Sequence, residues 1–244
     1  MKSEAGHDKQ KDEKRWLMLR ARLYEENIKN AFAYFRKNGI EPILIKGWAA
    51  ARYYPEPFRR IYNDIDLCVA PELYEKARAL LEPEEGRQLN VDLHSGFRHL
   101  DTVGWGELYA ESRILKLDDE EVRVLRPEDH LRILCVHWLT DGGAHRDKLE
   151  DFFHAVRNRP EDFDWDRCLQ VVSETRRGWI VKTIGLTNRY LGLDVSDLPF
   201  AEETMEIPVW LLRTVEKEWT SAIPLRPLHT LMGDKNEFWR QIKK

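Results

Sequence analysis

One segment constrains the fold of this chain more than any other: residues 59–69, with the sequence Arg-Arg-Ile-Tyr-Asn-Asp-Ile-Asp-Leu-Cys-Val. Its apolar residues alternate with Asp64 and Asp66, and this alternation predicts a β-strand at about 63–70. Because side chains two apart on a strand point to the same face, the two carboxylates should project together. Adjacent like charges are unfavourable unless a cation lies between them, and Mg²⁺ commonly takes one or two carboxylate ligands. The alternative is a strand end that carries two solvated acids.

The composition is that of a globular protein, with 42% apolar residues, 34% charged residues and nine tryptophans to fill a core. The formal net charge of −4 provides no global basic field and argues against a long nucleic acid as substrate. Cys68, Cys135 and Cys168 are far apart and form no Cys-x-x-Cys pair, so we expect buried thiols in a reducing compartment. No apolar run approaches the roughly 20 residues that span a bilayer, and the N-terminus has no apolar signal core. We therefore expect a soluble, cytoplasmic protein without membrane attachment.

The first half of the chain mixes helical and strand patterns. Residues 1–12 are polar and of mixed charge, and we expect them to be disordered. The remaining patterns predict helices at 13–38, 48–54 and 71–81, strands at 42–46 and 89–94, and a strand or hairpin at about 113–125.

After Arg126-Pro127 the pattern becomes helical throughout. Helices are predicted at 128–140, 146–158, 164–177, 179–192 and 204–220. We therefore predict two domains after the disordered start, an α/β domain over 13–126 and a helical domain over 127–244.

Two features before the acid pair are candidates for binding phosphate. Lys46-Gly47 lies at a strand-to-helix junction, where glycine lets the backbone approach a ligand and free N–H groups face it. Arg60 precedes the acid strand, and a guanidinium matches phosphate oxygens through its planar fork. Taken singly, these residues are equally compatible with a simple turn glycine and a solvated loop arginine.

A second strand carries Val91-Asp92-Leu93-His94, in which Asp92 and His94 share a face. A third carboxylate beside the first two would complete a metal cradle, and it could accept a proton from an attacking hydroxyl. The alternative is an ordinary amphipathic strand.

Taken together, these motifs resemble the nucleotidyltransferase superfamily typified by DNA polymerase beta, and within it a largely uncharacterised bacterial branch. The motifs that carry the resemblance are Leu44-Ile45-Lys46-Gly47-Trp48-Ala49, Tyr54-Pro55, Arg60 to Val69, and Asp92-Leu93-His94. The resemblance covers residues 40–95 and extends loosely to His137 and Asp151, where the branch tends to carry a histidine on one helix and an aspartate on the next. It implies an α+β fold, with a small mixed sheet, flanking helices and a helical C-terminal domain.

By this resemblance, Asp64, Asp66 and Asp92 bind the divalent metals, Mg²⁺ or Mn²⁺, and Lys46 and Gly47 contact the triphosphate. The chain departs from the wider superfamily in two places: the serine of its Gly-Ser motif is absent, and the 67–91 segment is short. The implied function is a metal-dependent nucleotidyltransferase, which moves a nucleoside monophosphate from an NTP to an acceptor hydroxyl or amine. Two metals can steady the attacking and the leaving oxygens of such a transfer.

The acceptor is a small molecule or a protein, and His94, His137 and Asp151 are candidates for its side of the site. Two arginine pairs, Arg157 with Arg159 and Arg176 with Arg177, are either solvated or candidates for an acceptor-binding wall. One alternative is a catalytically weak binding or regulatory module of antitoxin type, favoured by the missing serine and the short segment. Another is a metal-dependent hydrolase built on the histidines of the helical half.

Overall fold

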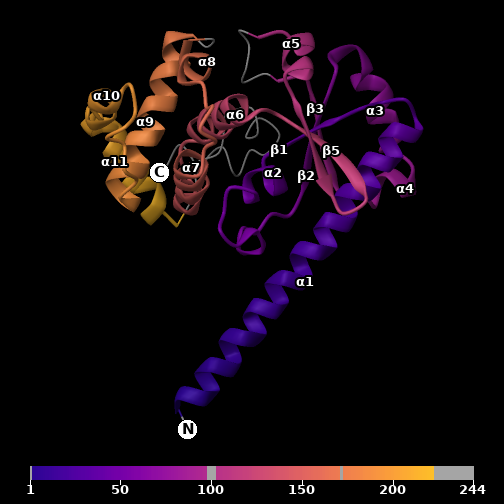
Figure 1. Ribbon diagram of the computed structural model, residues 1–244, viewed down its shortest axis with the longest axis horizontal. Helices are drawn as coiled ribbons and strands as arrows, with labels where there is room; N and C mark the ends of the chain where they lie inside the picture. Colours follow the sequence, from indigo (N-terminus) through magenta and orange to yellow (C-terminus); the bar gives the residue numbers. More distant parts are fainter. Residues whose placement is uncertain (1, 98–102, 171–172, 223–244) are drawn as a thin grey trace. The chain divides into compact units, whose positions relative to one another are not determined.

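The computed structural model describes residues 2–97, 103–170 and 173–222. Between Arg126 and Pro127 the chain divides into two compact units, which we call unit 1 and unit 2 (Figure 1). None of the described helices combines the length and the apolar character that crossing a bilayer requires. Cys68, Cys135 and Cys168 are buried free thiols, as predicted.

Unit 1 is built on a five-stranded mixed sheet with the strand order β3-β2-β1-β5-β4. Its central strand β1 pairs antiparallel with β2 and parallel with β5, β3 pairs parallel with β2, and β4 pairs antiparallel with β5. The strands are β1 (Ile43–Ile45), β2 (Ile65–Val69), β3 (Val91–Ser95), β4 (Arg113–Leu117) and β5 (Glu120–Val124). The predicted α+β class with a mixed sheet is confirmed.

The helices of unit 1 include one long element, α1 (Lys2–Lys37), which lies against the sheet near its C-terminal end and extends beyond it at its N-terminal end (Figure 1). Short helical elements connect the strands: α2 (Gly47–Ala51), η1 (Pro57–Arg59), η2 (Pro71–Leu73), α3 (Tyr74–Leu80), α4 (Glu84–Arg87) and α5 (Trp105–Ala110). Helix α4 is a single turn between α3 and β3.

Helix α1 begins at Lys2, so residues 2–12, for which the sequence predicts disorder, are helical in the structure. Near the end of this range, Asp12 and Arg15 form an i,i+3 pair at 4.0 Å. Further along, Ile28, Phe32 and Phe35 are buried at intervals of four and three residues, so one stripe of the helix packs into the core.

The alternation predicted for the acid strand is present in β2. Ile65, Leu67 and Val69 join the core cluster that also contains residues of α1. Because side chains alternate across a strand, Asp66 and Cys68 lie on the opposite face of the sheet. The predicted hairpin at 113–125 is β4 and β5, which pair antiparallel.

Unit 2 is helical in all its described elements: α6 (Pro127–Thr140), η3 (Arg146–Lys148), α7 (Leu149–Arg157), α8 (Trp165–Gln170), α9 (Glu174–Leu191), α10 (Ala201–Met205) and α11 (Val209–Thr220). Helices α6 and α7 pack against α9. Phe152 of α7 and Ile184 of α9 are among the side chains buried in this unit.

Two predicted helix boundaries in unit 2 are wrong. The helix predicted over 164–177 ends at Gln170, and α9 starts at Glu174, where the Ser173 side chain accepts a hydrogen bond from the Arg176 N–H. This N-cap outweighs Gly178, which lies within α9. The helix predicted over 204–220 is divided into α10 and α11, because proline at 208 lacks an N–H and instead occupies the N-cap of α11.

A buried ionic group joins α6 to α8. Asp129 and Arg132 are both fully buried, and Arg132 Nη1 donates to Asp129 Oδ1 at 3.0 Å. Arg167 Nη2 donates to the other oxygen of Asp129, also at 3.0 Å. Asp129 therefore bridges the guanidinium groups of Arg132 and Arg167 within unit 2.

Candidate functional site

The parallel pairing of β2 with β3 brings together three side chains that are potential metal ligands. Asp66 lies beside Asp92 in this register, and Cys68 lies beside His94. His94 Nε2 is 3.1 Å from Asp66 Oδ1 and 3.2 Å from Asp92 Oδ2. One ligand atom from each of Asp66, Asp92 and His94 lies within 4.8 Å of the others.

This group is buried on one side and open on the other. The Asp66 side chain is 4% exposed and that of His94 33%, whereas the Asp92 side chain is 53% exposed. Two carboxylates that share an imidazole form a donor set for a divalent cation, since carboxylates suit Mg²⁺ and Mn²⁺ and imidazole binds many divalent metals. A ligand can approach from the side of Asp92.

The electrostatic state of His94 follows from its two neighbours. Hydrogen bonds to Asp66 and then to Asp92 raise the pKa of His94 from its usual 6.5 to about 9, against the opposing effect of partial burial. The imidazolium therefore neutralises part of the carboxylate charge when no metal is bound. Burial raises the pKa of the neighbouring Cys68 thiol well above its usual value, so this thiol is not a thiolate ligand.

The predicted phosphate-binding pair, Lys46 and Gly47, lies at the end of β1. The register of β1 with β2 places Ile45 opposite Asp66, and the next residue, Lys46, forms an ion pair through Nζ with Asp66 Oδ1. Both residues of the pair have positive φ, 54° for Lys46 and 32° for Gly47. A Cβ at Gly47 would lie 3.7 Å from the carbonyl oxygen of Asp64, so this turn also packs closely.

The other predicted residues of unit 1, Asp64 and Arg60, lie before β2. Asp64 is exposed and lies in a bend directly before β2, and it is not one of the three grouped ligands. The alternation of the strand therefore does not extend to it. Arg60 is 9% exposed, and its Nη1 donates to the carbonyl oxygen of Ile61 at 3.4 Å.

The sequence makes His94 a candidate for the acceptor side, whereas the structure groups it with the potential metal ligands. The signal was the two-residue spacing of Asp92 and His94, which predicts a common face. What was missing was the register of β3 beside β2, because sequence spacing alone does not show which strands are neighbours.

The two predicted acceptor residues of the helical half lie on neighbouring helices of unit 2. His137 Nδ1 is 3.1 Å from Asp141 Oδ2, one helical turn further along. Asp151 is buried on α7, at 3% exposed. Within the described part of unit 2, no group of three or more histidine, cysteine or carboxylate ligands is close enough to hold a metal. The described residues of unit 2 therefore provide no metal centre for the hydrolase alternative.

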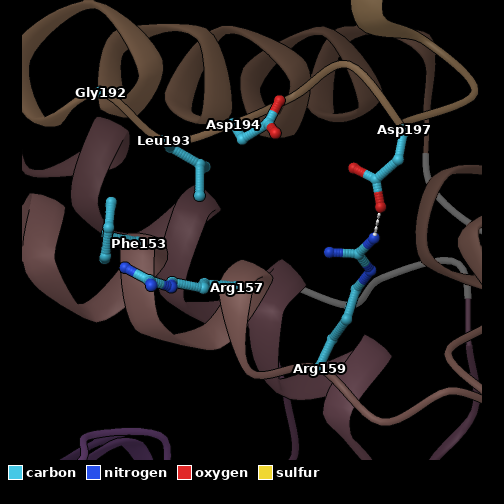
Figure 2. Close-up of a pocket in the computed structure, with 7 residues that line it drawn as sticks. All are labelled: Phe153, Arg157, Arg159, Gly192, Leu193, Asp194 and Asp197. Carbon is cyan, nitrogen blue, oxygen red and sulfur yellow. Dashed lines mark hydrogen bonds and ion pairs between the residues drawn. The ribbon is translucent and has the colours of Figure 1, made fainter.

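Unit 2 does contain a concave site with charged walls. A cavity of about 460 Å³ lies between the segment at the end of α7 and the segment after α9. Figure 2 shows the residues that line it. Arg159 forms an ion pair with Asp197 across it, and Arg157 lies over the ring of Phe153. Asp194 is held by the Ser196 backbone N–H and hydroxyl. The guanidinium groups at the end of α7 thus face the carboxylates of the segment after α9 across this cavity.

The raised pKa of His94 predicts a pH dependence of stability in the metal-free protein. A pKa that is higher in the folded state stabilises fully below the unfolded value of 6.5, and this contribution is lost as the pH rises through about 9. We expect the difference in free energy of unfolding between the wild type and His94→Gln to shrink across this window. Urea unfolding at about pH 6 and about pH 9.5 measures it, with the exposed His145→Gln as control. A difference that does not change with pH would contradict the assignment.

Comparison with known proteins adds one match. Residues 5–95 match the model of a family described as uncharacterised nucleotidyltransferase. No curated protein matches the chain, and no solved structure matches it. The matched range includes Lys46, Asp66, Asp92 and His94, and it confirms the resemblance inferred from the motifs. Through this N-terminal part, the chain is similar to the nucleotidyltransferases.

Proposed function

We propose that this protein is a nucleotidyltransferase that uses a divalent cation, Mg²⁺ or Mn²⁺, and an NTP. The observation that carries the proposal is the group formed by Asp66, Asp92 and His94. The Lys46 ammonium contacts the Asp66 carboxylate of this group. All four residues lie within the part of the chain that matches the nucleotidyltransferase family.

The residues divide the binding of the substrate between them. Asp66, Asp92 and His94 would hold the cation, which supplies charge neutralisation at the phosphate oxygens and orients them. The Lys46 ammonium adds a positive charge beside them, and Gly47 lets the backbone come close to a phosphate. Such positioning and neutralisation provide most of the catalysis in phosphoryl transfer.

The chemical step follows from the open side of the site. A hydroxyl or amine of the acceptor attacks the α-phosphorus, the bond between this phosphorus and the bridging oxygen breaks, and pyrophosphate leaves. Asp92 is the more exposed of the two grouped carboxylates, so it is the candidate to accept the proton of the acceptor. The acceptor is a small molecule or a protein, and the net charge of −4 does not favour a long nucleic acid.

A second candidate is a binding or regulatory module that makes little use of catalysis. Asp64, which the superfamily pattern assigns to the metals, lies outside the ligand group and is exposed. This module would associate tightly with a partner protein and show no turnover that depends on a metal.

Thermal unfolding of the full chain with each of ATP, GTP, CTP and UTP tests the proposal. We expect at least one triphosphate to raise the melting temperature by about 5–10 °C with Mg²⁺ or Mn²⁺ present, which corresponds to a ligand at roughly 100 times its Kd. The same nucleotide without a divalent cation should give a much smaller shift. If no triphosphate stabilises the protein under either condition, the proposal fails and the regulatory alternative is favoured.

A further inference from the structure

The cationic side chain of Lys46 contacts the ligand group directly. Its Nζ contacts Asp66 Oδ1, the same oxygen that lies 3.1 Å from His94 Nε2. The lysine side chain is only 17% exposed and that of Asp66 only 4%. The largely covered ammonium thus already supplies one positive charge to this buried carboxylate.

The backbone determines where this lysine side chain begins. Lys46 has φ 54° and ψ −142°, a conformation that residues other than glycine rarely adopt. Lys46 follows Ile45, which pairs with Asp66, so the strand register places the turn next to Asp66. The following Gly47 would bring a Cβ to 3.6 Å from the Tyr62 ring, so the turn is packed from that side. The ammonium is therefore held at Asp66 by the register of the strands and by the turn.

The carboxylates available in this group suit one divalent cation better than two. Transfer with two metals places the ions about 3.5–4 Å apart, and shared carboxylates are needed to hold both. The group contains two carboxylates, Asp66 and Asp92, and an imidazole. Asp64 is exposed and outside the group, while one oxygen of Asp66 is engaged by Lys46.

We infer that the ammonium of Lys46 serves as the second cation of this site, so that the chain holds one divalent ion where two-metal enzymes hold two. A lysine ammonium is a compact point charge, so it can neutralise phosphate in place of a metal ion. Unlike a metal ion, it is covalently attached to the chain and does not exchange with solvent. The inference rests on the proposed function, from which it takes the binding of a divalent cation at Asp66, Asp92 and His94.

Counting bound Mn²⁺ ions tests this inference. The full chain is titrated with Mn²⁺ and the free ion is measured by electron paramagnetic resonance, both without nucleotide and with the unreactive α,β-methylene-ATP. We expect one Mn²⁺ per chain for the wild type and for Lys46→Arg, which keeps the charge. Lys46→Met removes the charge and should take up a second ion when the nucleotide is present. Lys76→Met is the matched control, because Lys76 is exposed and donates to the carbonyl oxygen of Asn38.

Two results would overturn the inference. One is a count of two ions for the wild type. The other is a count of one for Lys46→Met with the nucleotide bound, because the charge at this position would then not determine the number of ions. If Lys46→Met does not fold, the counts for the wild type and Lys46→Arg still test the inference, because a wild-type count of two ions would overturn it. A wild-type count of two with nucleotide bound leaves the proposed function standing, whereas a count of zero removes its metal centre.

Discussion

Asparagine in place of Asp66 is expected to lower the rate of nucleotidyl transfer by about 10³-fold, which is close to 4 kcal/mol of transition-state stabilisation. Asp66 is the carboxylate that the other charged groups share: its Oδ1 contacts both Lys46 Nζ and His94 Nε2. Asparagine keeps the shape and an acceptor oxygen but removes the negative charge. The variant thus loses the charge that holds the cation and positions the ammonium.

The same substitution should remove the stabilisation by the triphosphate that depends on a divalent cation. This effect is measured by thermal unfolding and does not require the acceptor to be known. Asp119→Asn is the matched control, because the Asp119 side chain is 90% exposed at the turn between β4 and β5. If Asp66→Asn keeps the full metal-dependent shift, the cation is bound elsewhere and the assignment of the site is wrong.

Asp129→Ala is expected to destabilise unit 2 by about 3–5 kcal/mol. Asp129 accepts hydrogen bonds from Arg132 and Arg167, and the Asp129 and Arg132 side chains are fully buried. Removing the carboxylate takes a counter-charge away from two guanidinium groups, one of which is fully buried. This energy is a large fraction of the 5–15 kcal/mol that typically stabilises a protein of this kind.

Urea unfolding of the full chain, followed by tryptophan fluorescence, measures the effect. The matched control is Asp197→Ala, which also breaks a carboxylate–arginine pair, here with Arg159, but at a side chain that is 60% exposed. We expect this control to change the free energy of unfolding by less than about 1 kcal/mol, because exposed ion pairs contribute little. Equal effects for the two variants would show that Asp129 is not the counter-charge of a buried network.

Local patterns were sufficient for several elements. The alternation in 63–70 predicted β2, and the glycine after Lys46 predicted a turn, because strand periodicity and positive φ depend on a few neighbouring residues. The boundaries of α8, α9 and α11 were misplaced where two local signals compete. Ser173 and proline at 208 are the N-caps of α9 and α11. Sequence alone does not show whether the cap at Ser173 or the glycine at 178 determines where α9 begins, because packing of the helices decides between them.

The sequence by itself determined which residue types this protein has for its chemistry: Asp66 on a half-apolar strand, Asp92 and His94 two apart on another, and Lys46-Gly47 at a turn. These follow from spacing along the chain. Only the tertiary structure decided which of them meet. The parallel register of β2 with β3 groups Asp66, Asp92 and His94, and the antiparallel register of β1 with β2 brings Lys46 onto Asp66. Asp64, one residue before β2, is left outside. The physical reason is that strand neighbours and their register are set by burial of the whole sheet, whereas periodicity is a property of each strand alone.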